Sequence, residues 1–145
     1  MPGFYVGWLP DDQWRPLLSY VLDQADSYRV HVPEGPGGQL SYGREQFKAL
    51  PESSVTPWSG MRDALEIAGE LSPGARELFA TMENSLASFN PTEKLWDYQL
   101  LRRGDVLLRI GDYHDLLLYP TYADLSHLRF RGVVTDAWHP LSEQR

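Results

Sequence analysis

Three stretches of the chain place apolar residues at helical spacing and therefore predict helices. The first follows Asp11 and Asp12, either of which can cap a helix, and ends before Tyr28. The second begins at Ser59, and the third begins at Ser72 with Pro73 in the first helical position. The apolar stripes are Trp14, Leu17, Leu18, Val21, Leu22 and Ala25; Met61, Ala64, Leu65, Ala68 and Leu71; and Ala75, Leu78, Phe79, Met82, Leu86 and Phe89. We expect the third helix to stop at Asn90 and Pro91.

The alternating pattern typical of strands appears in two regions. Residues 28–32 alternate apolar positions with Arg29 and His31, which predicts a half-buried strand with His31 on its polar side. Residues 95–119 contain three further strand patterns separated by turns at residues 103–105 and 111–114, which predicts an antiparallel meander. Leu116–Leu118 is apolar without alternation, so we expect the last of these strands to be covered on both faces.

Shorter sequence patterns predict the remaining strands, helices and loops. Strands are expected at residues 4–8 and 129–135, short helices at 43–50 and 121–128, and irregular chain at 33–38 and 52–58. In the 121–128 helix, Thr121 and Asp124 have the spacing of a capping box. The 145 residues show no repeat or domain boundary, so we expect a single α+β domain over 1–145. Its three principal helices should pack on a mainly antiparallel sheet of five or six strands.

Composition narrows the classes of function. The formal charge is −7 and cysteine is absent, so a nonspecific nucleic-acid binder, a disulfide scaffold and a cysteine-based metal site are not expected. Residues 1–10 contain neither a basic residue nor a long apolar run, and no stretch has the length of a membrane span. We therefore expect a soluble cytoplasmic protein with no membrane partner.

Motifs that carry chemistry are scarce, and the chain contains no phosphate loop, dinucleotide fingerprint or zinc-protease motif. We expect no cofactor. The strongest catalytic candidate is the turn at Asp112, His114 and Asp115, where a carboxylate could orient a histidine base or the group could bind a metal. The competing interpretation is that both aspartates only form the turn, since aspartate is favoured there.

The helices predicted over residues 59–90 are acidic, with a net charge of −3. Asp63, Glu66 and Glu70 are spaced three and four residues apart and would share one helix face. That face is either an ordinary solvated surface or a docking surface that attracts a basic protein.

Two classes of function stay open. The first is a small acidic protein-binding domain, with an immunity-type neutraliser of a basic toxin as its most specific form. Small size, acidity and 12% aromatic residues fit that class. The alternative is a small-ligand binder or enzyme with an aromatic pocket that uses the Asp112/His114/Asp115 turn. Binding without catalysis is the favoured interpretation, and self-association stays open.

Overall fold

The computed structural model describes residues 3–34, 41–83 and 94–141. The helices are α1 (Asp11–Gln24), α2 (Arg44–Lys48), α3 (Pro73–Met82) and α4 (Tyr122–Phe130). The strands are β1 (Phe4–Tyr5), β2 (Ser27–Pro33), β3 (Ser54–Pro57), β4 (Ala64–Glu70), β5 (Asp97–Arg102), β6 (Asp105–Gly111), β7 (Asp115–Leu118) and β8 (His139–Pro140). No helix within these ranges is long and apolar enough to cross a membrane.

The strands form one sheet in the order β3-β4-β2-β5-β6-β7-β1-β8, and every neighbouring pair is antiparallel. The α+β class is therefore confirmed, as is the meander, which forms β5, β6 and β7. The described chain has four helices and eight strands, more strands than the expected five or six. The strands that the sequence pattern did not predict are β8 and the pair β3 and β4, which lie in a region assigned to irregular chain and a helix.

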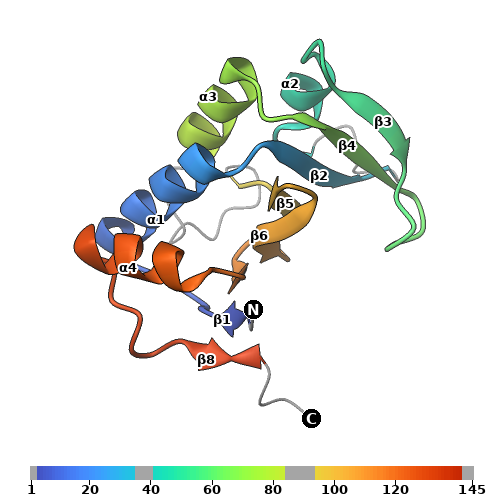
Figure 1. The fold of residues 1–145 in the computed structure, drawn as a ribbon. Coiled ribbons are helices and arrows are strands. Elements are labelled where there is room, and N and C mark those ends of the chain that lie inside the picture. The colour runs from blue at the N-terminus through green and yellow to red at the C-terminus, as the bar shows by residue number, and fades with distance from the viewer. Residues whose placement is uncertain (1–2, 35–40, 84–93, 142–145) are drawn as a thin grey trace.

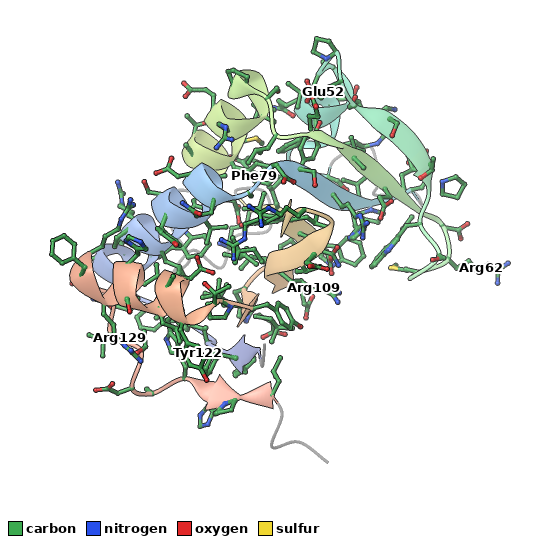
Figure 2. The ribbon with its side chains drawn as sticks, in the orientation of Figure 1. Glu52, Arg62, Phe79, Arg109, Tyr122 and Arg129 are labelled. Atoms are coloured by element: carbon green, nitrogen blue, oxygen red, sulfur yellow. The ribbon has the colours of Figure 1, made fainter. Side chains whose placement is uncertain are left out.

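Helices α1, α3 and α4 lie in one layer over one face of the sheet (Figure 1). That face carries the core, in which Phe79 of α3 contacts Tyr98 and Tyr28 at ring-centroid distances of 5.1 and 6.0 Å. Figure 2 shows Phe79 between the helix layer and the sheet. Trp14 on α1 is fully buried in the same layer. The apolar stripes of the first and third predicted helices thus face this core.

The opposite face of the sheet is polar. Arg29, Gln99 and Arg109 lie directly across from one another on β2, β5 and β6, and each is at least partly exposed. Because side chains alternate between the two faces of a strand, the polar positions of the sequence pattern collect here. The sheet therefore has one apolar face beneath the helices and one polar face.

The prediction of a helix from Ser59 to Leu71 is wrong, because residues 64–70 form β4. β4 pairs with β2 over seven residues and with β3 on its other side. Alanine, leucine and glutamate favour helices, but two paired neighbours and the burial of Ile67 outweigh that preference. Gly69 fits the strand, since a Cβ there would meet the backbone oxygen of Glu52 at 2.9 Å.

The expectation that Leu116–Leu118 is covered on both faces is also wrong. Leu116 and Leu118 are buried under the helices, whereas Leu117 is only partly buried on the polar face. The run still lies in the sheet interior, between β6 and β1.

Several element boundaries also differ from the predictions. Residues 129–135 do not form a strand, because α4 continues to Phe130 and the last strand is β8. The start of α1 is capped at Pro10 without a side-chain bond, so neither Asp11 nor Asp12 is the cap. Ser72 caps α3 as expected, and the capping box of α4 is present. The expected stop of the third helix, with Leu86 and Phe89, lies outside the described residues.

Candidate functional site

His31 is a buried residue on the polar face of the sheet. It lies near the end of β2, where Arg29 on the same face is exposed and Pro33 is partly exposed, yet only 1% of His31 is exposed. The cover is Trp58, whose ring stacks on the imidazole at a centroid distance of 3.8 Å and an angle of 10°. Trp96 meets the Trp58 indole edge-on at 5.9 Å. An aromatic pair thus closes over a polar group outside the core.

Both ring nitrogens of His31 lie within hydrogen-bonding distance of a carboxylate oxygen. Asp97 Oδ1 lies 2.8 Å from Nδ1, and Glu66 Oε1 lies 3.0 Å from Nε2. The sheet register produces this arrangement, since Glu66 on β4 and Asp97 on β5 lie directly opposite His31. Each ring nitrogen of His31 is therefore within hydrogen-bonding distance of a carboxylate oxygen from a neighbouring strand.

Arg109 extends the cluster along the polar face. Its Nη2 lies 3.2 Å from Asp97 Oδ2, so Asp97 contacts His31 through one oxygen and Arg109 through the other. Figure 2 shows Arg109 on the side of the sheet away from α1 and α3. Both ring nitrogens of His31 already contact carboxylates, and the ring is buried beneath Trp58. The cluster therefore holds Trp58 and Arg109 in place on the polar face.

The antiparallel order brings distant acidic residues to the same end of the sheet. β4, β5 and β7 start there, and β2 and β6 end there. The turn between β6 and β7 also contacts the residue before β5, because the Tyr113 backbone N–H donates a hydrogen bond to the Trp96 carbonyl at 2.7 Å. We call this region the acidic–aromatic end; its members are Trp58, Asp63, Glu66, Trp96, Asp112 and Asp115.

The predicted partner-binding residues are thereby separated. Asp63 and Glu66 lie at the acidic–aromatic end, but Glu70 lies at the opposite end of β4, across from Ser27. The shared helix face proposed for Asp63, Glu66 and Glu70 does not exist, because β4 is a strand. Asp63 instead lies in the turn before β4 with a φ of 57°.

The Asp112–Asp115 segment is a turn, as expected, between β6 and β7. Asp112 and Tyr113 have positive φ values of 49° and 75°. His114 is partly buried, and the Tyr5 hydroxyl donates to Asp115 Oδ1 at 3.4 Å. Within residues 3–34, 41–83 and 94–141, no group of three or more histidine, aspartate or glutamate side chains is placed to hold a metal ion.

No protein-family model matches the chain, and no curated protein or solved structure matches it significantly.

A second buried ionisable cluster lies in the core, where Glu83 follows α3. Its Oε2 accepts a hydrogen bond from the Leu95 backbone N–H at 3.1 Å, while Oε1 and the nearby Tyr98 hydroxyl have no hydrogen bond of good geometry. Burial raises the pKa of Glu83 from 4.5 to about 7, against the opposing effects of Lys94, the Leu95 N–H and Tyr98. Burial also lowers the pKa of Lys94.

This raised pKa predicts a specific pH dependence of stability. The folded state keeps a proton on Glu83 that the unfolded state releases above about pH 4.5, so the stabilisation is full below that pH and is lost as pH rises through about 7. Relative to Glu83→Gln, the wild-type free energy of unfolding should fall over this range by on the order of 3 kcal/mol. Urea unfolding of both proteins from pH 4 to pH 8 measures it, and a constant difference would contradict the assignment.

Proposed function

We propose that this chain is a small protein-binding domain whose partner is a basic protein that docks on the acidic–aromatic end. The observation that carries the proposal is the Trp58–Trp96 indole pair, in which Trp58 stacks on a histidine flanked by Glu66 and Asp97. In its most specific form, the domain is a cytoplasmic immunity-type neutraliser of a basic toxin.

The chemistry of this end suits a lysine or arginine of the partner. An indole face attracts a cation, and neighbouring carboxylates pair with it. Asp63 and Asp112 are exposed, and neither carboxylate has an ion-pair partner among the described residues. The net charge of −7 would also steer a basic protein toward the domain at low salt.

The alternative, a small-ligand site or enzyme built on the Asp112/His114/Asp115 turn, has less support. Such a site needs a pocket lined by aromatic residues and a histidine. The lining of the groove beside β5 and β6, which includes three arginines, contains neither tryptophan nor histidine. The geometry therefore favours a surface that engages a protein.

Capture from cell extract with matched variants tests the proposal. Asp63→Asn, Asp112→Asn and Asp115→Asn together remove three charges at the acidic–aromatic end. Asparagine tolerates the positive φ of Asp63 and Asp112, so the backbone should be retained. We expect the wild type to retain a basic protein that the triple variant loses.

The control is the triple variant Asp12→Asn, Glu70→Gln and Glu77→Gln, which removes three exposed charges elsewhere. Both triple variants have a formal charge of −4 instead of −7, so net charge cannot explain a difference between them. Retention of the same proteins by both variants would exclude the acidic–aromatic end as the docking site.

A further inference from the structure

A groove of about 720 Å³ lies beside β5 and β6, toward the end of the sheet opposite the acidic–aromatic end. Its volume is in the range of small-molecule sites. The lining residues are Gln99, Arg102, Arg103, Asp105, Val106, Leu107, Arg109, Tyr119 and Thr121. Three arginines against one aspartate make this groove a basic surface on an acidic chain.

The three arginines differ in the hydrogen bonds and ion pairs that they already form within the protein. Arg102 forms two hydrogen bonds with Asp124, at 3.0 and 2.6 Å, and so anchors α4 to β5. The pKa of Asp124 lies below its ordinary value because Arg102, Tyr20 and the Thr121 N–H donate hydrogen bonds to it. Arg109 has the single contact to Asp97 and is 38% exposed. Arg102 is therefore structural, whereas Arg109 has donors left for a ligand.

Arg103 has no carboxylate within ion-pair distance among the described residues. It occupies the β5–β6 turn with a φ of 53°, next to Gly104 with a φ of 83°. Two positive φ values are typical of a type I′ turn, in which asparagine followed by glycine is preferred. An arginine costs stability at this position, and such costs concentrate at functional sites. Its backbone N–H donates to Asp26 Oδ2 at 2.9 Å, which fixes the turn.

The walls of the groove identify the class of ligand. Val106 and Tyr119 supply apolar surface and one aromatic ring to the groove that Arg103 also lines. Guanidinium groups bind the oxygens of a phosphate with paired hydrogen bonds, and a tyrosine ring packs against a flat apolar group. The geometry points to a binding site for a small organic phosphate that has an aromatic ring. The phosphate lies against Arg103, and the ring lies against Tyr119.

Calorimetric titration of the full chain tests this site with four compounds. Phenyl phosphate and AMP carry both features, inorganic phosphate lacks the ring, and adenosine lacks the phosphate. We expect phenyl phosphate or AMP to bind with a Kd of about 1 mM or tighter, and the other two compounds at least about tenfold more weakly. Failure of both phenyl phosphate and AMP to bind, or equal binding of inorganic phosphate, would overturn the proposal.

The variant Arg103→Asn tests whether Arg103 binds the ligand or only shapes the β5–β6 turn. Asparagine suits the turn, so the variant should be at least as stable as the wild type yet bind at least about tenfold more weakly. Arg62→Asn makes the same exchange at an exposed site far from the groove (Figure 2) and should leave affinity unchanged. Unchanged affinity in Arg103→Asn, or an equal loss in Arg62→Asn, would exclude Arg103 as a ligand-binding residue.

Discussion

Leu116→Asp should prevent stable folding at 25 °C or lower the free energy of unfolding by about 4 kcal/mol or more. Leu116 is fully buried on β7 beneath the helix layer, and it pairs across the sheet with Ile110, which is also fully buried. A carboxylate placed there loses its water without gaining a partner. Urea unfolding followed by circular dichroism measures the loss.

Leu117→Asp is the matched control, one residue along the same strand. Leu117 lies on the polar face and sits directly between Arg109 and Tyr5 on the neighbouring strands. An aspartate there can pair with Arg109, so we expect a change within about 1 kcal/mol. Equal losses in the two variants would contradict the assignment of one apolar and one polar face to the sheet.

The second large effect is expected for His31→Ala, at about 3 kcal/mol of lost stability. Removing the imidazole leaves Asp97 buried with Arg109 as its remaining side-chain partner, and it leaves a cavity beneath Trp58. The stack on Trp58 would be lost as well, so tryptophan fluorescence should change. Chemical denaturation and the emission spectrum report these two effects.

Arg29→Ala provides the comparison for this prediction. Arg29 lies two residues before His31 on the same strand and face, but it is exposed, and its Nη1 makes only a 3.4 Å contact with Gln99. We expect a loss below about 1 kcal/mol. If His31→Ala were no more destabilising than Arg29→Ala, the cluster would not be the organising element of this face.

The elements that the sequence predicted best are those whose local pattern and tertiary environment agree. The apolar stripe of α1 faces the core, Ser72 and Pro73 start α3, and the turn at Arg103 and Gly104 connects β5 to β6. Each of these signals lies within a few residues along the chain. They were therefore sufficient for the helix layer and the meander.

β4 shows where local reasoning failed. The residues from Ala64 to Glu70 have high helix propensity, and their apolar positions fit a helical stripe as well as a strand. The segment forms a strand because it pairs with β2 on one side and with β3 on the other. A sequence window that omits these partners cannot contain that information.

The assignment of residues 64–70 to a helix also prevented prediction of the candidate site. The pattern of residues 28–32 and 95–101 already placed His31 and Asp97 on the polar positions of two strands. Glu66 was assigned to a helix, so its position across from His31 was not foreseen. The signal that could have found the cluster is the pairing of β2 with both β4 and β5, which brings three distant polar residues into one row.

The most direct test of the proposed function is the rate at which the captured basic partner associates with the domain at low and high salt. At low salt, Asp63→Asn/Asp112→Asn/Asp115→Asn should associate about tenfold or more slowly than Asp12→Asn/Glu70→Gln/Glu77→Gln, and the two rates should converge as salt rises. Docking at the acidic–aromatic end predicts this result, because the variants differ only in where charge is removed. Equal rates at low salt would contradict it.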